Sequence, residues 1–248
     1  MGVACVGSSS FLLMGSRPLI YIFQDEMTLE TSGTKKLNAI ILGGTGLVGG
    51  KCLSQLLDSS HYEKVVALTR RPLERDSPHG GKASLLESIH PYNELSTYTP
   101  AVPIDHVFCA FGTTLSRAGS QEVMRNIDVE IPLAFFKRMK ELGAKHASLV
   151  SSIGANPSSR SFYPRIKGEL EVELLRLGFE SVDIFRPSVI GGSRKDDARP
   201  AERLMQFVLR FAPKSLRTIP AATIARAMVS GAIEAKPGHR TVLSQDMW

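Results

Sequence analysis

Two residues four positions apart, Tyr163 and Lys167, have the side chains needed for proton transfer to a carbonyl oxygen. On a helix this spacing places both on one face. Tyrosine has an ordinary pKa of about 10 and is a weak base at neutral pH, but a neighbouring ammonium favours its phenolate form. A tyrosine beside a lysine can therefore give a proton to a carbonyl oxygen during reduction, or take one from a hydroxyl in reverse. We expect Tyr163 to be the acid/base and Lys167 to assist it.

Two serines, Ser151 and Ser152, stand at the end of an apolar run that we expect to be a strand. A hydroxyl aimed at the reacting oxygen would stabilise the charge that develops there. Either Ser151 or Ser152 could take this role. Each pattern is common by chance, but their occurrence together, downstream of a glycine-rich turn, indicates carbonyl chemistry.

The glycine-rich turn is the segment GGTGLVGG, residues 43–50. It lies between an apolar run of strand length and a helical pattern, and its glycines fit both G-x-x-G-x-x-G and G-x-G-x-x-G. Glycine lets backbone N–H groups approach a pyrophosphate, and the helix N-terminus adds a positive dipole end. The alternative is a purely structural strand–helix turn. The residues expected to bind a dinucleotide here are Gly43, Gly44, Thr45, Gly46, Leu47, Val48 and Gly49.

Two arginines, Arg70 and Arg71, follow the second predicted strand. A site that prefers NAD usually carries Asp or Glu at this position, where the carboxylate holds the ribose 2′-hydroxyl. Guanidinium groups instead form charge-assisted bonds with a 2′-phosphate. We therefore expect NADP(H) as the cofactor, with NAD(H) the less favoured choice; the alternative is that both arginines merely decorate the surface.

Apolar runs of strand length alternate with helical patterns along the chain, which indicates parallel β-α-β units. We expect strands at residues 36–42, 64–69, 82–86, 105–110, 146–151, 181–186 and 241–243, and helices at 47–58, 121–142, 163–177, 201–211 and 223–234. Pro132 should kink or restart the long helix. The predicted fold is an α/β, doubly wound parallel sheet, Rossmann-like, with a small irregular C-terminal region on the substrate side. Residues 1–36 are expected to form a flexible extension, and residues 37–248 one NAD(P)-binding domain.

Composition sets broad limits on function. The 248 residues are 43% hydrophobic and 22% charged, with a net charge of +6. The sequence has no nucleic-acid-binding motif, no metal-ligand spacing and no apolar run long enough for a membrane span. The three scattered cysteines suggest a reducing compartment, so we expect a cytoplasmic protein. Residues 194–226 are rich in Lys and Arg, which fits either an anionic substrate or a solvated basic face.

The sequence resembles the short-chain dehydrogenase/reductase superfamily, and within it the atypical branch of Tat-interactive-protein-like oxidoreductases. The resemblance covers the chain from about Leu37 onward and is carried by ILGGTGLVGG, LTRRP, CAFGTT, LVSSIGA, YPRIKGELE and FRPSVIGG. It implies a Rossmann-like fold and an NADP-dependent oxidoreductase that acts on a small carbonyl or hydroxyl compound. The positions that it implies along the cofactor, besides the glycine turn and the two arginines, are Phe111, Gly112, Tyr163, Lys167, Ile190 and Arg199, with Arg194 near cofactor or substrate. It also implies that Ser152, with Ser151 as the alternative, orients the carbonyl.

One position departs from the family pattern. Many members carry an asparagine before the serine strand where this chain has Asp128, with Asn126 two residues earlier. This departure puts an asparagine-linked proton relay in doubt. Two other functions remain open: an NADPH-binding regulatory or sensor protein that acts through a protein partner, and a nucleotide-sugar epimerase-like enzyme. The sequence leaves the choice between monomer and homodimer open.

Overall fold

A computed structural model describes residues 36–73, 81–191 and 218–248 of the chain. Its elements, in order, are β1 (Leu37–Leu42), α1 (Leu47–Asp58), β2 (Tyr62–Thr69), β3 (Ser84–Ile89), η1 (Tyr92–Glu94), β4 (His106–Cys109), α2 (Leu115–Ala118), α3 (Gln121–Arg125), η2 (Asn126–Glu130), α4 (Ile131–Glu141), β5 (His146–Val150), α5 (Phe162–Arg176), β6 (Ser181–Arg186), β7 (Ile190–Gly191), β8 (Ile219–Pro220), α7 (Ala221–Glu234), β9 (Gly238–Leu243) and η3 (Ser244–Asp246). No helix in these ranges is long and apolar enough to cross a membrane.

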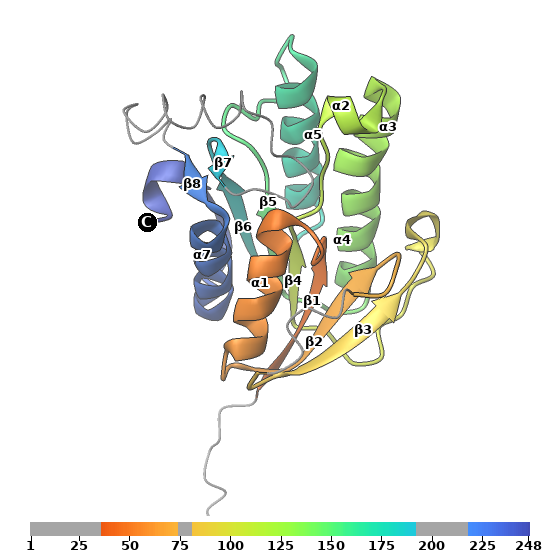
Figure 1. Cartoon of the computed structure of the whole chain (residues 1–248), viewed down its shortest axis with the longest axis vertical. Helices are drawn as coiled ribbons and strands as arrows, with labels where there is room; N and C mark the ends of the chain where they lie inside the picture. Colours follow the sequence, from red (N-terminus) through yellow and green to blue (C-terminus); the bar gives the residue numbers. More distant parts are fainter. Residues whose placement is uncertain (1–35, 74–80, 192–217) are drawn as a thin grey trace, which may run out of the picture. The chain divides into compact units, whose positions relative to one another are not determined.

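The central sheet has seven parallel strands in the order β3-β2-β1-β4-β5-β6-β9 (Figure 1). From β1 the chain builds outward to β3, then returns to place β4 on the other side of β1. Leu42, the last residue of β1, pairs with Leu68 of β2 and with Cys109 of β4. The order reverses beside these strand ends, and in open α/β sheets this is where ligands bind.

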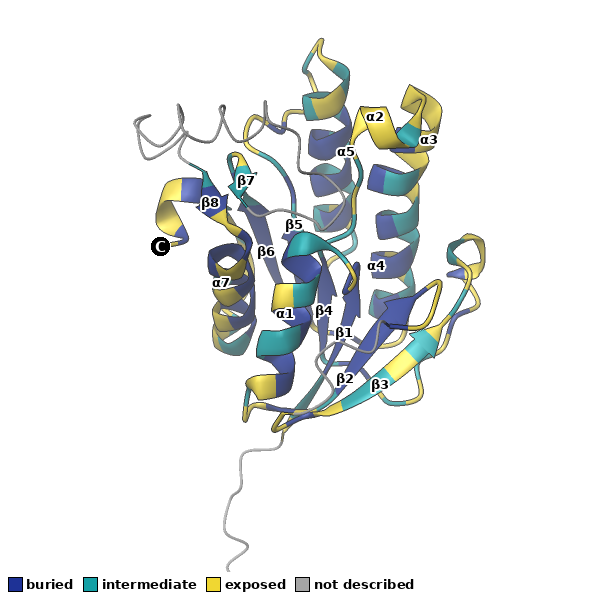
Figure 2. Ribbon diagram, viewed as in Figure 1, coloured by how far each residue is buried: buried dark blue, intermediate teal, exposed yellow. Residues whose placement is uncertain are grey.

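Helices cover both faces of the sheet, so the predicted doubly wound fold is confirmed (Figure 1). The alternation of side chains along β1 shows the two layers: Ala39 and Ile41 pack in the core beneath α1 and α7, while Ile40 packs in the opposite core beneath α4 and α5. The central strands are buried and read as continuous apolar runs, whereas the edge strand β3 alternates between intermediate and exposed residues (Figure 2).

The long helix expected at 121–142 is present but is divided into three segments. A π-helical segment, η2, lies between α3 and α4, and Pro132 is placed in the first turn of α4. Proline has no N–H to donate to the residue four positions earlier, so the irregularity lies just before it. The π-helical turn also turns the buried side chain of Asp128 toward the end of β4. Such π-helical insertions are frequent at functional sites.

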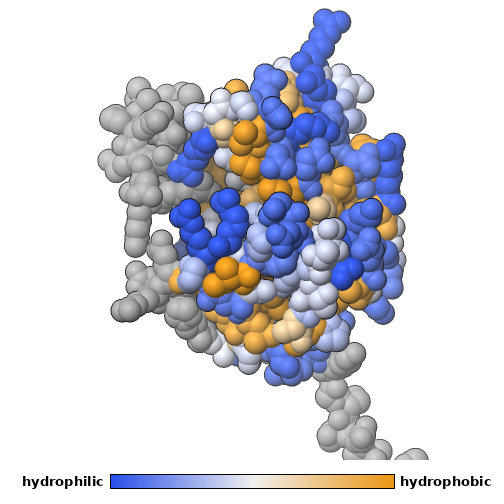
Figure 3. Space-filling view, turned by 90° about the vertical axis from the view of Figure 1, so that its right-hand side faces the viewer, coloured by the Kyte–Doolittle hydropathy of each residue, from blue (hydrophilic) through white to orange (hydrophobic). Residues whose placement is uncertain are grey.

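Other predicted boundaries move by a few residues. The uncertain strand expected at 82–86 is β3 at Ser84–Ile89, and the C-terminal strand is longer, at Gly238–Leu243. The two-stranded sheet of β7 and β8 was not predicted, because each strand has only two residues. The helix expected at 201–211 and most of the expected N-terminal extension lie outside the described residues. On the side seen in Figure 3 the surface is largely hydrophilic, with apolar patches between polar residues.

Candidate active site

The glycine-rich turn connects β1 to α1, and at two of its glycines the backbone lies in close contact with neighbouring backbone. Gly43 has a φ of +91°, and a Cβ there would lie 2.6 Å from the carbonyl oxygen of Ala110 at the end of β4. A Cβ on Gly49 would lie 1.9 Å from the carbonyl oxygen of Gly43. Both positions therefore require glycine, one for its backbone conformation as well as for space and the other for space alone.

The N-terminus of α1 is free of side-chain caps. Its N-cap residue, Gly46, gives no side-chain hydrogen bond, and no acidic residue lies in the first turn. The first N–H groups of a helix have no partner within the helix, and together with the macrodipole they form a site for an anion. The twelve-residue helix therefore presents an anion-binding end at the carboxyl edge of the sheet.

A cavity of about 230 Å³ connects this helix end with the predicted proton-transfer residues. It is lined by Leu47, Val48, Ala110, Phe111, Gly112, Thr113, Thr114, Asp128, Val150, Ser151, Tyr163, Lys167 and Ile190. Residues separated by more than one hundred positions in the sequence, such as Val48 and Tyr163, thus lie around one space. The first residues of α1 and the predicted proton-transfer residues therefore border the same cavity.

Lys167 and Asp128 form a buried ion pair in the wall of this cavity. The Nζ atom of Lys167 lies 2.7 Å from Oδ1 of Asp128, and the exposed fractions of the two side chains are 4% and 1%. The other carboxylate oxygen accepts a hydrogen bond of 3.0 Å from the backbone N–H of Thr113. Burial lowers the pKa of Lys167, but the charge of Asp128, followed by that of Tyr163 and the hydrogen bond to Asp128, raises the pKa above its ordinary value overall.

The same ion pair leaves no space for a side chain at position 112, which is a glycine. A Cβ at this position would lie 2.9 Å from Oδ1 of Asp128, so the carboxylate occupies the space that a side chain would need. Asp128 therefore fixes both the lysine and the backbone that follows β4. The sequence singled out Asp128 only as a departure from the family pattern, because nothing local shows that it meets a lysine 39 positions away.

Tyr163 lies in the first turn of α5, with 39% of its surface exposed. The Nζ atom of Lys167 is 5.9 Å from the centroid of its ring, so the expected neighbourhood of the two side chains is present. The helix is held close to the preceding loop: a Cβ on Gly168 would lie 2.3 Å from the backbone N of Pro157, and the N–H of Asn156 donates to the carbonyl of Pro164.

The two serines have different partners. The hydroxyl of Ser151, which lines the cavity, donates to Oε1 of Glu171, and Arg186 binds both oxygens of that carboxylate. The hydrogen bond from Arg186 to Glu171 raises the pKa of Arg186, which burial alone would lower. Ser152 is partly buried, is not among the residues that line the cavity, and has only a 3.3 Å contact from its hydroxyl to the carbonyl of Ile153.

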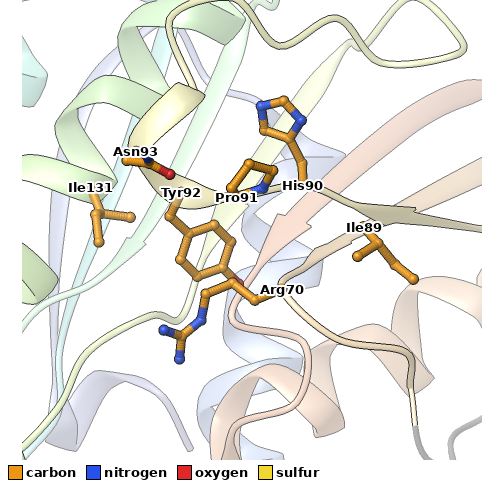
Figure 4. A pocket seen from close by; sticks show the side chains of 7 residues that line it. All are labelled: Arg70, Ile89, His90, Pro91, Tyr92, Asn93 and Ile131. Carbon is orange, nitrogen blue, oxygen red and sulfur yellow. The ribbon is translucent and has the colours of Figure 1, made fainter.

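A separate pocket of about 410 Å³ lies where β2 and β3 end (Figure 4). It is lined by Arg70, Ile89, His90, Pro91, Tyr92, Asn93 and Ile131. The guanidinium of Arg70 lies 5.3 Å from the centroid of the Tyr92 ring, and the two side chains lie against each other in Figure 4. Tyr92 also meets Phe111 edge to face, with ring centroids 5.1 Å apart. Phe111 belongs to both groups of residues, since it lines the first cavity.

The structure brings seven of the predicted site residues around the first cavity: Leu47, Val48, Phe111, Gly112, Tyr163, Lys167 and Ile190. Of the glycine-turn residues only Leu47 and Val48 are among those that line the cavity; the others do not: Gly43, Gly44, Thr45, Gly46 and Gly49. Arg71 is exposed beside Arg70 without lining the second pocket. Arg199 and Arg194 lie outside the described residues. The sequence reasoning missed Tyr92, Glu171 and Arg186; of these only Glu171 had a signal, since it continues the four-residue spacing of Tyr163 and Lys167.

Relatives of the chain share most of its length. The mitochondrial protein fmp52 of Aspergillus clavatus is 32% identical over 221 residues, which cover 85% of this chain and 93% of the relative. HTATIP2 of Rattus norvegicus is 30% identical over 210 residues, covering 83% of the chain and 85% of that protein. The chain belongs to their family, an atypical branch of the short-chain dehydrogenases/reductases. No family model matches the sequence.

Solved structures show the same fold at low sequence identity. MoeE5 in complex with UDP-glucuronic acid and NAD has a TM-score of 0.64 and 18% identity, and the match covers 83% of this chain and 75% of that one. The UDP-N-acetylglucosamine 4-epimerase of Methanobrevibacter ruminantium has a TM-score of 0.62 and 17% identity, over 84% of this chain and 77% of that one. These matches confirm the Rossmann-like fold.

The expectation of a cytoplasmic location is wrong. Family members from Aspergillus clavatus, Candida albicans and Eremothecium gossypii are all named as mitochondrial proteins, which contradicts this expectation. The prediction rested on scattered cysteines, and Cys52 and Cys109 are indeed buried thiols. Free thiols report a reducing environment, and they do not distinguish the cytosol from another compartment that keeps thiols reduced.

Proposed function

We propose that the protein is an NADP-dependent oxidoreductase that transfers hydride between the nicotinamide and a small carbonyl or hydroxyl compound. The observation that carries this proposal is the cavity that runs from the uncapped N-terminus of α1 to Tyr163 and Lys167. A structural turn alone would need no such space. Family membership supports an oxidoreductase-like function, and the solved neighbours include complexes with NAD.

The residues present fit a nicotinamide dinucleotide. Gly43 and Gly49 allow the turn, the end of β4 and α1 to lie in close backbone contact, and the uncapped N–H groups of α1 could then bind a pyrophosphate. Tyr163, Lys167 and Ile190 would hold the nicotinamide end, and Arg70 with Arg71 the adenosine end. When bound there, the nicotinamide supplies or accepts the hydride.

The chain itself handles the proton. In the proposed reduction, the phenol O–H of Tyr163 gives its proton to the carbonyl oxygen of the substrate. In the oxidation, the phenolate oxygen of Tyr163 takes the proton of the substrate hydroxyl. The Lys167 ammonium lies beside the ring of Tyr163, and Asp128, whose Oδ1 is 2.7 Å from Nζ of Lys167, offsets much of its positive charge. We therefore assign Lys167 two roles, holding the ribose hydroxyls and providing a weakened positive field beside the tyrosine.

Ser152 remains our choice for the hydroxyl that donates to the reacting oxygen. A serine has one proton to donate, and that of Ser151 is directed to Glu171. The backbone on both sides of Ser152 is fixed, because Ser151 and Ile153 donate to the carbonyls of Phe185 and Pro187. The side chain of Ser152 can therefore turn toward a substrate on a rigid support.

The cofactor choice is tested by titrating purified protein with NADPH and NADH, for wild type and for Arg70→Ala/Arg71→Ala. We expect wild type to bind NADPH more tightly, and the double variant to bind NADPH about 10- to 100-fold more weakly, since charge-assisted bonds are lost. A control variant, Arg176→Ala/Lys236→Ala, removes two exposed cations far from both cavities and should leave binding unchanged. If the control variant loses as much NADPH affinity as Arg70→Ala/Arg71→Ala, the loss reflects net charge and not contacts made by these two arginines.

The chemistry is tested with Tyr163→Phe, which keeps the ring and removes the proton. Carbonyl reduction should fall by about 100-fold or more, while NADPH binding changes little. Tight NADPH binding without any carbonyl turnover in wild type would favour the regulatory alternative. If neither cofactor binds, the oxidoreductase proposal fails and the glycine turn is structural.

A further inference from the structure

A third cavity adjoins Tyr163 and is distinct from the Arg70 pocket. It has a volume of about 400 Å³, within the range of small-molecule sites, and is lined by Thr113, Thr114, Leu115, Gln121, Met124, Phe162 and Tyr163. Tyr163, Thr113 and Thr114 also line the cavity assigned to the cofactor. Tyr163 therefore stands between the two spaces, where a group that passes a proton to a substrate must be.

The walls of this cavity are apolar, with a few neutral polar groups. Met124 is 3% exposed and Phe162 is packed against the adjoining core, while Leu115 is 48% exposed at the surface. The remaining lining residues are polar but neutral: Thr113, Thr114, Gln121 and Tyr163. Among the described residues that line the cavity, none carries a charge.

The neighbouring charges are already paired. Lys167 is the one cation among the described residues that line either space beside Tyr163, and its ammonium is held by Asp128. A carboxylate or phosphate buried here would lose its hydration without gaining a cation. An apolar group would gain free energy by leaving water for walls of this kind.

We propose that this cavity takes the body of the substrate, and that the substrate is an aldehyde or ketone, or the corresponding alcohol, with an uncharged apolar chain or ring. The proposal rests on the proposed function, because it uses Tyr163 as the proton donor. It sets carboxylated carbonyl compounds and nucleotide sugars apart as poor substrates.

The test compares three aldehydes in NADPH-dependent reduction: nonanal, the aldehyde-acid of the same chain length, and glyceraldehyde. We expect kcat/KM to be highest for nonanal, by at least about 10-fold over each of the others. Leu115→Lys places a cation in the wall at an exposed position. It should lower kcat/KM for nonanal about 10-fold and raise that for the aldehyde-acid. Leu142→Lys, an exposed leucine outside the cavity, is the matched control and should change neither value.

Two results would overturn the proposal while leaving the proposed function in place: Tyr163-dependent turnover that is faster with the aldehyde-acid, or a Leu115→Lys variant that behaves as its control. A second measurement covers the case in which no aldehyde is reduced. Calorimetry of NADP-saturated wild type with nonanol and with nonanoate should show binding of the alcohol alone, lost in Leu115→Lys. UDP-glucose is titrated in the same way. Tighter binding of nonanoate or of UDP-glucose than of nonanol, or no binding of any of the three, would refute the apolar site.

Discussion

Replacing Gly49 by alanine tests the close contact between α1 and the glycine-rich turn. The new Cβ would lie 1.9 Å from the carbonyl oxygen of Gly43, whereas real Cβ contacts are essentially never shorter than 3.0 Å. The helix or the turn must therefore move by about 1.1 Å, the difference between these two distances. The obstacle is backbone, which cannot rotate away as a side chain would. We expect Gly49→Ala to lower the free energy of unfolding by about 2–3 kcal/mol, as overpacking does.

The neighbouring glycine provides a matched control. A Cβ on Gly50 would lie 3.4 Å from the carbonyl oxygen of Gly44, which is an ordinary contact. Gly50→Ala should therefore stabilise the protein by up to about 1 kcal/mol, because alanine favours the helix. The two variants carry the same change one residue apart, so their difference isolates the contact.

Thermal unfolding and NADPH titration provide the assay. For a domain of this size we expect the two melting temperatures to differ by roughly 6–12 °C. NADPH should bind more weakly to Gly49→Ala, since the shifted turn no longer presents its N–H groups in the same place, and unchanged to Gly50→Ala. If both variants have the same melting temperature and affinity, α1 does not lie against the turn as described.

Three further predictions concern polar groups. Ser152→Ala should reduce turnover by about 100-fold with little change in stability, whereas Ser151→Ala should mainly lower the free energy of unfolding, by about 1–2 kcal/mol, because it removes a buried hydrogen bond. Asp128→Ala should cost about 3–5 kcal/mol in urea unfolding, because the buried Lys167 loses its partner. Burial is the largest influence on two histidines, and it lowers the pKa of His106 to about 4 and that of His146 to about 3. The unfolded chain then binds more protons between pH 6.5 and these values, so stability should fall as the pH drops through this window.

Each of these has a result that contradicts it. Equal turnover of the Ser152 variant and wild type would remove that serine from the chemistry. A loss for Asp128→Ala no larger than that for Glu173→Ala, which breaks an exposed pair with Arg176, would show that the buried pair contributes little. A free energy of unfolding that is constant from pH 6.5 to pH 4 in both wild type and a His146→Gln variant would contradict the histidine argument.

Local signals account for the parts of the fold that the sequence predicted well. The run Leu37–Leu42, the glycines after it and the helix Leu47–Asp58 lie next to each other in the chain, so turn chemistry and periodicity define them together. The edge strand β3 gave a weak signal, because its residues are only partly buried and show no clear apolar pattern.

The site was predicted to the extent that its residues share one element. Tyr163 and Lys167 lie one turn apart on α5, so spacing alone brings them together. The pairing of Lys167 with Asp128 depends on a π-helical turn that no propensity predicts. Likewise, the partners of Glu171 come from the ends of β5 and β6, and a single sequence does not show which strands will be neighbours.

One face of α5 carries Tyr163, Lys167 and Glu171, and Gly168 fixes the helix against the loop before it. The proton donor, the buried cation and the group that anchors the end of β5 therefore belong to one rigid body. A change that displaces this helix would disturb all three at once. Changes in substrate range, by divergence or by engineering, are therefore expected at residues outside α5. The variable walls available are Leu115, on α2, and Gln121 with Met124, on α3, which can change the shape of the substrate space while the proton-transfer apparatus stays in place.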